Sequence, residues 1–279
     1  MIDYKKYGER IVVGVSGGKD STATCLHLIE QGFAKGDFDR VFLDVGWEHS
    51  ETYRYLDELE KTIGPIVRLR QHVKVKKEHQ EIVNEIEKDL GHESDFVRYM
   101  VRWADFPSYF RKWCTRELKL KPLKRYLRAL EFEPINAIGI RWAESKKRAE
   151  YSEWEWNKHL DVYSYRPILK WSYEDVIAIH RRFGLSPNPL YLKHSDRVGC
   201  YPCIYTRKDE IRYLEDARVR VIEKLESHIS QTRGVKMGFL RNQPIRDILE
   251  WSKTALGGQQ YRLFDIEPRK CEKWGMCGA

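Results

Sequence analysis

The sequence predicts an α/β fold in which helices cover both faces of a parallel sheet, a doubly wound arrangement. Short apolar stretches alternate with helix-like amphipathic stretches over about the first 185 residues. A glycine-rich turn follows the first apolar stretch, where such sheets bind ligands. The 279 residues, 42% hydrophobic and 33% charged, suit a globular chain with a sizeable core.

The first elements alternate strictly in type. Gly32 and Gly64 end the two helices, and Ser50 is the expected N-cap of the second. The ranges are strands at 10–16, 40–46 and 65–70, and helices at 21–32 and 50–64. Each helix can therefore serve as a crossover between two parallel strands.

The remaining elements are less regular. A charged, helical stretch runs from about residue 79 to 130 and is broken near Phe106–Pro107. A strand is expected at 134–140 and an amphipathic helix at 172–184. Beyond about Leu185 the pattern changes to prolines, paired cysteines and another charged helix. We therefore expect two parts: a nucleotide-binding domain over 1–185, and a small cysteine-bearing unit over 186–279 that packs on the sheet.

Charge and composition limit the partners and the compartment. The net charge of +8 favours polyanionic ligands such as nucleotides or nucleic acid, although a solvated basic surface gives the same total. No apolar run approaches the roughly 20 residues that span a bilayer, and the first ten residues lack the apolar segment of an export signal. A cytoplasmic location without a membrane partner is the expectation.

The turn after the first strand reads SGGKDS and has the features of a phosphate site. A helix N-terminus offers unpaired N–H groups and partial positive charge to an anion, whereas the simpler alternative is a tight turn made possible by glycine. The spacing excludes a Walker A loop and a G-x-G-x-x-G dinucleotide loop. The candidate phosphate-binding residues are Ser16, Gly17, Gly18, Lys19, Asp20 and Ser21.

Six cysteines in a reducing compartment favour metal binding or redox chemistry over disulfides. Cys200 and Cys203 form a C-x-x-C pair that could hold zinc or an iron–sulfur cluster, act as a redox couple, or be inert. Cys25 shares a helical face with Leu28 and Ile29, so we expect it in the core.

The run SGGKDS resembles the PP-loop (S-G-G-x-D-S) of the ATP pyrophosphatases and sulfonucleotide reductases. Further segments resemble the PAPS and APS reductases in the same order: LDVGWEHSET with Asp44, WCTRELKLKPL with Cys114 and Lys119, GIRWAESKKR with Arg141 and Arg148, then WSYEDV, NPLY and GCYPC. The chain is therefore similar to the PAPS reductase-like proteins of the PP-loop superfamily, which include the ATP pyrophosphatases of DNA phosphorothioation.

The resemblance implies a PP-loop α/β fold, an adenine nucleotide and, as in many members, a 4Fe–4S cluster. Cys114, Cys200 and Cys203 would be ligands, with Cys277 or Cys271 as the fourth; we favour Cys277, and zinc is the alternative metal. Two departures stand out. Thr115 follows Cys114 where cluster-bearing reductases have a second cysteine, and the chain ends in KCEKWGMCGA, without the full motif around the reductases' nucleophilic cysteine.

Three functions follow. The first is an ATP pyrophosphatase that adenylates an acceptor, such as a nucleic-acid backbone, for sulfur insertion. Lys19 and Arg141 would stabilise phosphate charge and Asp20 would place Mg²⁺, while Asp44, Lys119, Arg141 and Arg148 would complete the nucleotide site. The second is a PAPS or APS reductase with Cys277 as nucleophile. The third is a non-catalytic partner that binds nucleotide and cluster. A cysteine desulfurase would be the sulfur donor of the first, and thioredoxin the reductant of the second.

The basic residues and one aromatic run each allow either contact with nucleic acid or a structural role. The basic run 68–77 and the residues Lys124, Arg125 and Arg128 could contact a nucleic-acid backbone or form solvated faces. The aromatic run EWEW at 153–156 could stack on bases, although aromatic residues more often serve packing.

Overall fold

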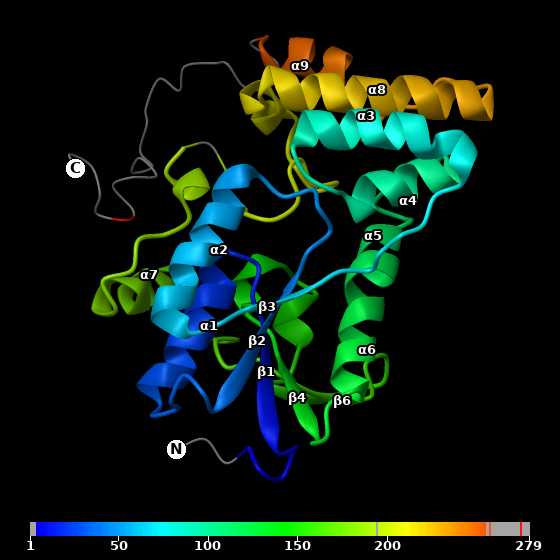
Figure 1. The fold of residues 1–279 in the computed structure, drawn as a ribbon. Helices are drawn as coiled ribbons and strands as arrows, with labels where there is room; N and C mark the ends of the chain where they lie inside the picture. Colours follow the sequence, from blue (N-terminus) through cyan, green and yellow to red (C-terminus); the bar gives the residue numbers. More distant parts are fainter. Residues whose placement is uncertain (1–3, 194, 255–256, 258–273, 275–279) are drawn as a thin grey trace.

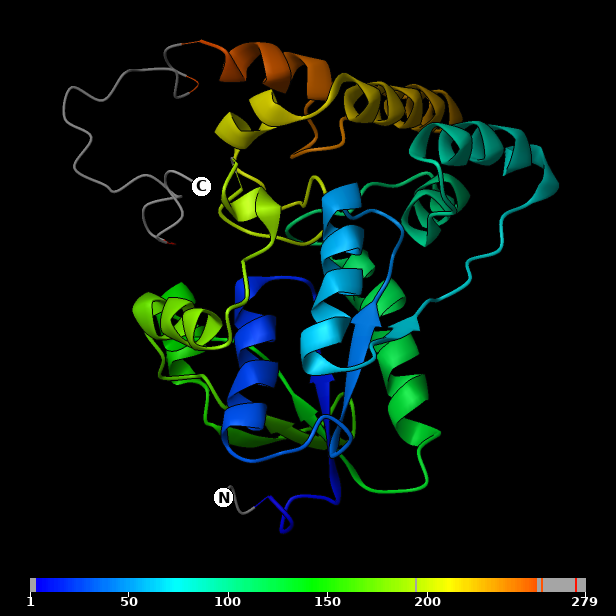
Figure 2. The same cartoon turned by 60° about the vertical axis from the view of Figure 1, so that its left-hand side comes forward.

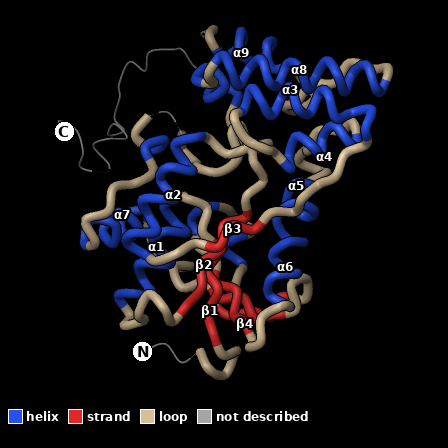
Figure 3. Tube along the Cα trace, in the orientation of Figure 1, coloured by secondary structure: helices blue, strands red, loops and turns tan. Residues whose placement is uncertain are grey.

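The structure, a computed structural model, describes residues 4–193, 195–254, 257 and 274. Its centre is a six-stranded sheet in the order β3-β2-β1-β4-β6-β5 (Figures 1 and 3). All neighbouring strands run parallel except β5 and β6, which form an antiparallel pair at one edge. The strands are β1 (Arg10–Gly14), β2 (Phe38–Leu43), β3 (Val67–Leu69), β4 (Pro134–Ala137), β5 (Trp154–Asn157) and β6 (Val162–Tyr165).

The described residues also form α-helices of 3 to 18 residues. They are α1 (Lys19–Glu30), α2 (Ser50–Ile63), α3 (Gln80–Leu90), α4 (Asp95–Trp103), α5 (Trp113–Thr115), α6 (Lys121–Arg128), α7 (Tyr173–Arg182), α8 (Asp216–Arg233) and α9 (Ile245–Ser252). A π-helical turn at Arg116–Leu120 joins α5 to α6. Short 3₁₀ turns lie at Lys77–His79, Trp142–Glu144, Arg148–Glu150, Pro189–Tyr191 and Lys208–Tyr213. None of the helices described is long and apolar enough to cross a membrane.

Alternation of side chains along β1 gives the sheet two buried faces. Ile11 and Val13 belong to a hydrophobic cluster that includes residues of α1, α2 and α7. Val12, which points the other way, packs in a second cluster with Leu123 and Leu127 of α6. A strand buried on both faces is typical of a parallel sheet covered by helices, so the doubly wound prediction is confirmed.

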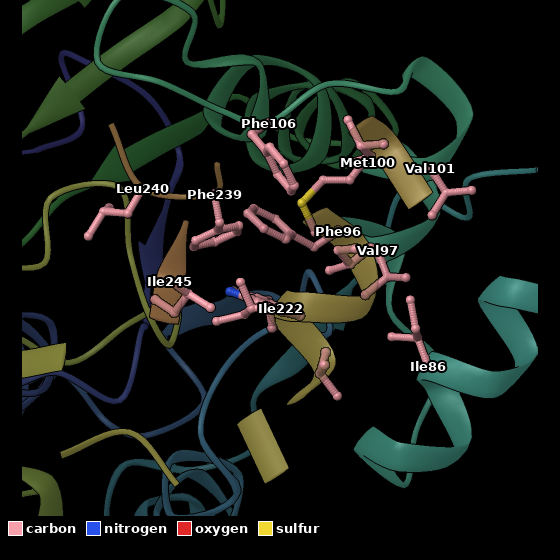
Figure 4. Packing of buried hydrophobic residues seen from close by; sticks show 14 of the residues in the cluster. Ile86, Phe96, Val97, Met100, Val101, Phe106, Ile222, Phe239, Leu240 and Ile245 are labelled. Atoms are coloured by element: carbon pink, nitrogen blue, oxygen red, sulfur yellow. The ribbon is translucent and has the colours of Figure 1, made fainter. Parts of the chain in front are cut away.

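A separate layer of helices lies beyond the carboxyl ends of the strands, toward which the arrowheads point in Figure 2. Its core joins α3 and α4 to α8 and α9 and includes Ile86, Phe96, Met100, Ile222 and Phe239 (Figure 4). The described C-terminal helices therefore pack on α3 and α4, not on the sheet as expected. The division of the chain near residue 185 stays a prediction.

Three local expectations need correction. The N-cap of α2 is His49 instead of Ser50, because the His49 side chain accepts the Glu51 N–H. The expected long helix is also interrupted at Gly91, which takes a left-handed conformation, before Ser94 caps α4. The β5–β6 hairpin was not predicted, since its polar, aromatic sequence lacks the apolar run of a buried strand. Cys25 is fully buried, as expected.

Candidate functional site

The loop between β1 and α1 is shaped by its own serines. Ser21 Oγ accepts the Ser16 N–H at 3.1 Å and donates to the Gly18 carbonyl at 2.9 Å. Gly18 N donates weakly to Ser16 Oγ at 3.3 Å. Gly17 has a φ of +70°, a conformation that glycine adopts without steric cost. These contacts fix the turn that leads into the first N–H groups of α1, where an anion would bind.

Two residues that are distant in the sequence, Asn188 and Tyr191, form hydrogen bonds with the backbone of this loop. Asn188 donates to the Gly17 carbonyl at 3.3 Å and to Thr52 Oγ1 at 3.4 Å. The Tyr191 hydroxyl accepts the backbone N–H of Lys19 at 3.2 Å, and burial raises the pKa of that hydroxyl. The NPLY segment that contains both residues was not predicted to contact the loop. The missed signal is a polar asparagine placed between two prolines before an apolar pair.

A compact charge cluster forms at the first turn of α1. Asp20 lies between two cations: its Oδ2 is 3.1 Å from Lys19 Nζ and its Oδ1 is 2.6 Å from Arg141 Nε. Lys19 is only 9% exposed and Arg141 5%. The ammonium of Lys19 also lies over the rings of Tyr173 and Tyr191, 5.6 and 5.0 Å from their centroids. The structure therefore brings together the three predicted catalytic residues.

The arrangement qualifies the predicted role of Asp20. Both of its carboxylate oxygens are already paired with cations, so to act as a Mg²⁺ ligand it would first have to release Lys19 or Arg141. An incoming phosphate could replace it, because phosphate oxygens offer these cations the same kind of partner. The two cations and one carboxylate leave the cluster with a net positive charge, which favours such an exchange.

Arg148 and Asp44, both predicted for the nucleotide site, are held in different ways. Arg148 pairs with Glu144, and a carboxylate oxygen of Glu144 accepts the Arg141 N–H at 2.9 Å. Arg148 is thereby connected to the charge cluster through one residue. Asp44 follows the end of β2, where it accepts the Gly46 N–H and the Tyr53 hydroxyl, both at 2.8 Å. Contact of either residue with a nucleotide stays a prediction.

Cys200 lies next to two buried charged residues. Its thiol is 3.5 Å from Lys119 Nζ and donates to Glu48 Oε1 at 3.7 Å. Burial raises the pKa of Cys200 and also that of Glu48. Cys200 and Glu48 raise the pKa of Lys119 and outweigh the lowering that its own burial causes. Lys119 therefore keeps its proton. Glu48 was not predicted as a site residue, because its position two residues after Gly46 gave no chemical signal.

The other two cysteines belong to the same neighbourhood. Cys203 and Cys114, like Cys200, contribute to raising the pKa of Lys119. Burial is the main cause that raises the pKa of the half-buried Cys114. The Cys203 N–H donates to Thr206 Oγ1 at 2.9 Å, which fixes the turn after the C-x-x-C pair. Lys119, predicted for nucleotide contact, is thus placed among the three thiols.

Three cysteines of the expected cluster site, Cys114, Cys200 and Cys203, lie within the described residues. In the part of the chain that the structure describes, no group of three or more His, Cys, Asp or Glu side chains is arranged to hold a metal ion. The expected fourth ligands, Cys271 and Cys277, lie outside the described residues. Cys114, Cys200 and Cys203, each partly exposed, nevertheless carry the thiol donors that iron–sulfur clusters use, so the chemistry of these residues fits such a group.

Most of the basic residues considered for nucleic-acid contact have partners within the protein. In the run 68–77, Arg68 pairs with Asp57, and Arg70 Nε lies 3.3 Å from the buried Asp95. The three basic residues predicted on α6 contact protein groups: Lys124 with the His159 carbonyl, Arg125 with the Arg70 carbonyl, and Arg128 with Asp161. These contacts favour a structural role over a nucleic-acid surface.

The EWEW run also serves packing. Trp154 is stacked between Tyr7 and Tyr165, with ring centroids 4.0 Å away on each side. Trp156 is 46% exposed and meets Tyr163 edge to face at 5.0 Å. Only Trp156 of this pair therefore leaves a ring surface to solvent.

Comparison with known proteins identifies the family of this chain. The family model for the phosphoadenosine phosphosulfate reductase domain matches residues 10–206. An uncharacterized 37.8 kDa protein of Escherichia phage 186 is 31% identical over 319 residues, which cover 95% of each chain. Adenosine 5'-phosphosulfate reductase of Allochromatium vinosum is 28% identical over 169 residues, 59% of this chain and 57% of that enzyme. The solved phosphoadenylyl-sulfate reductase of Candida auris matches with a TM-score of 0.47 and 14% identity, over 70% of this chain and 82% of that chain.

Proposed function

This chain belongs to the phosphoadenosine phosphosulfate reductase domain family, and within that family we propose that it is an ATP pyrophosphatase that adenylates an acceptor for sulfur insertion. The acceptor that we propose is a nucleic-acid backbone, as in DNA phosphorothioation. A cytoplasmic location and a cysteine desulfurase as sulfur donor belong to the same proposal.

The observation that carries the proposal is the charge cluster of Lys19, Asp20 and Arg141 at the start of α1. Two buried cations share a single carboxylate, so the site keeps a net positive charge. An entering polyphosphate would stabilise it, because its charged oxygens can pair with each cation. The N–H groups of the α1 N-terminus add donors to the same anion. The β- and γ-phosphates of ATP, neutralised further by Mg²⁺, are the ligand that best matches this charge.

The reaction follows from that placement. An acceptor oxygen attacks the α-phosphorus, the bond from the α-phosphorus to the bridging oxygen breaks, and pyrophosphate leaves with the electron pair. Lys19 and Arg141 stabilise the negative charge that grows on the leaving pyrophosphate, a contribution that dominates phosphoryl-transfer catalysis. The acceptor, now carrying AMP, reacts with a sulfur nucleophile, and AMP leaves.

The cysteine neighbourhood supports a sulfur-handling role. Lys119 stays protonated among Cys114, Cys200 and Cys203, so it can stabilise negative charge on sulfur. Cys277 is the fourth ligand that we propose, with Cys271 as the alternative. A 4Fe–4S cluster, when bound there, would either stabilise this region or receive and pass on sulfur.

A sulfonucleotide reductase is the second candidate, favoured by the similarity to adenosine 5'-phosphosulfate reductases such as that of Allochromatium vinosum. In that case the loop would hold PAPS or APS, and Cys277 would attack the sulfur. We place it second because Met276 precedes Cys277, where the reductase motif has an acid.

The test is to purify the full chain anaerobically and incubate it with Mg²⁺ and either ATP or PAPS. We expect AMP and pyrophosphate from ATP, with activity lost in Lys19→Met and retained in the surface control Lys158→Met. Sulfite formed from PAPS with thioredoxin, and lost in Cys277→Ser, would overturn the proposal in favour of a reductase. No product from either nucleotide would favour a non-catalytic partner that binds nucleotide and cluster.

The absorption spectrum of the same sample tests the metal. A thiolate-to-iron band near about 400 nm is expected, and Cys200→Ser should abolish it. Stoichiometric zinc without that band would contradict the iron–sulfur assignment.

A further inference from the structure

A surface groove begins beside the C-x-x-C pair, at Ile204 and Tyr205. It has a volume of about 820 Å³ and is formed by residues 106–111, 204–205 and 237–242. Its lining contains aromatic rings and two arginines, Arg111 and Arg241, and no acidic residue among those described. The groove plays no part in the reaction proposed above.

The aromatic residues of this groove are unusually exposed. Phe110 is 91% exposed, Tyr109 64% and Tyr205 40%. Tyr109 meets the other two rings edge to face, with centroids 5.4 Å from Phe110 and 6.0 Å from Tyr205. Three large rings gathered in solvent gain nothing for the core, and such patches mark interaction sites.

Cations surround the same rings. Lys112 Nζ is 4.6 Å from the Tyr109 centroid and 5.4 Å from that of Tyr205, and the Arg197 guanidinium lies 5.9 Å from Tyr205. Arg111 is paired with Asp105, whereas Lys112 and Arg241 form no ion pair with any described carboxylate. The groove therefore presents ring faces together with uncompensated positive charge.

We propose that this aromatic groove binds single-stranded nucleic acid. Unpaired bases can stack on Tyr109, Phe110 and Tyr205, and the phosphates between them can pair with Lys112 and Arg241. A positive groove lined with aromatic side chains is how proteins bind single strands without sequence preference. An acidic peptide would use the charge and leave the rings unmatched, and a duplex hides the base faces that the rings require.

The position of the groove suggests what the strand is for. Lys112 stands two residues before Cys114 in the chain. Tyr205 follows Cys203 by two residues. A strand in the groove therefore passes its backbone close to the three thiols. Binding is inferred from the groove itself, whereas the identification of this strand as the acceptor of sulfur depends on the proposed function.

The experiment measures binding of a fluorescent oligothymidylate of about 12 nucleotides to the full chain, by anisotropy and without ATP. Phe110→Ala and Tyr205→Ala should each weaken binding about 5- to 150-fold, the effect of losing one stacked base. Lys112→Ala should reduce the salt dependence, lowering the slope of log K against log salt by about 0.7. Matched controls are Trp156→Ala, an exposed ring on β5, and Lys158→Ala, an exposed lysine beside it; both should bind as the parent does.

The outcomes separate this inference from the proposed function. Absence of oligothymidylate binding, or equal loss in Trp156→Ala and Phe110→Ala, overturns the groove even if ATP is cleaved to AMP and pyrophosphate. Binding that depends on Phe110 supports the groove even if no nucleotide is cleaved. Equally tight binding of a matching duplex or of polyglutamate would also overturn it. So would sedimentation that shows a dimer dependent on Phe110 and no binding of oligothymidylate.

Discussion

Replacing Asp20 by asparagine removes the carboxylate that Lys19 and Arg141 share. The asparagine oxygen can still accept one hydrogen bond, so the substitution changes charge with little change in shape. Because both cations are almost fully buried, they would be left close together without a counter-charge. The variant therefore represents the loop with Lys19 and Arg141 unpaired, which is the state that an entering polyphosphate would bind.

The expected magnitude follows from the burial of this cluster. Breaking a buried ion pair by removing one partner costs about 3–5 kcal/mol, and the remaining hydrogen bond favours the lower end. A loss of about 3 kcal/mol would lower Tm by about 6–12 °C for a chain of this size. Pyrophosphate, added with EDTA to exclude metal, should restore more stability in Asp20→Asn than in the parent, because in the parent it must first displace Asp20.

The assay is thermal unfolding across a pyrophosphate titration, analysed by ligand linkage. We expect pyrophosphate to bind Asp20→Asn at least about tenfold more tightly, a difference of about 1.4 kcal/mol. The control is Asp95→Asn, a fully buried aspartate paired with Arg70 and two backbone N–H groups. It should lose stability without pyrophosphate rescue. Equal pyrophosphate stabilisation of Asp20→Asn and the parent would refute the view that Asp20 occupies the place of a phosphate.

Three further predictions concern single positions. Gly139→Ala would place a Cβ 2.5 Å from the Asp20 carbonyl, so nucleotide binding measured by calorimetry should weaken at least tenfold; unchanged binding would mean that the loop shifts freely. Tyr191→Phe removes the acceptor of the Lys19 N–H and should cost about 1 kcal/mol of unfolding free energy in urea, against no loss if water replaces the hydroxyl. Burial raises the pKa of Glu226 to about 7 from its ordinary 4.5, although its Oε1 accepts two backbone N–H groups. The folded protein then holds a proton that the unfolded chain has released, so stability should fall as pH rises from about 4.5 to about 7, by about 3 kcal/mol. Glu226→Gln should remove that fall, and identical pH profiles would contradict the shift.

Much of the fold could be predicted because its signals are local. The apolar strands, the helix ends at Gly32 and Gly64 and the loop glycines are all written in short windows of sequence. The β5–β6 hairpin escaped prediction because its strands are held by cross-strand aromatic packing, such as Trp154 against Tyr165, instead of by an apolar period.

The helical layer could not be predicted for a related reason. α3 and α4 are separated from α8 by more than a hundred residues, and their amphipathic faces do not specify which partner they meet. We expected the C-terminal part to pack on the sheet, whose two faces are also apolar. Only complementary packing of the side chains shown in Figure 4 decides between the two.

The sequence by itself determined the doubly wound class and the family to which the chain belongs, and it predicted SGGKDS as a phosphate-binding loop. These depend on residue types at fixed short spacings. Tertiary structure decided the state of the loop: Asp20 paired with Arg141, and Tyr191 and Asn188 fastening the turn from about 170 residues away. It also gathered Lys119 among the cysteines and left Phe110 beside Tyr205 at the surface. Such contacts are set by how the packed elements meet, which no local pattern encodes.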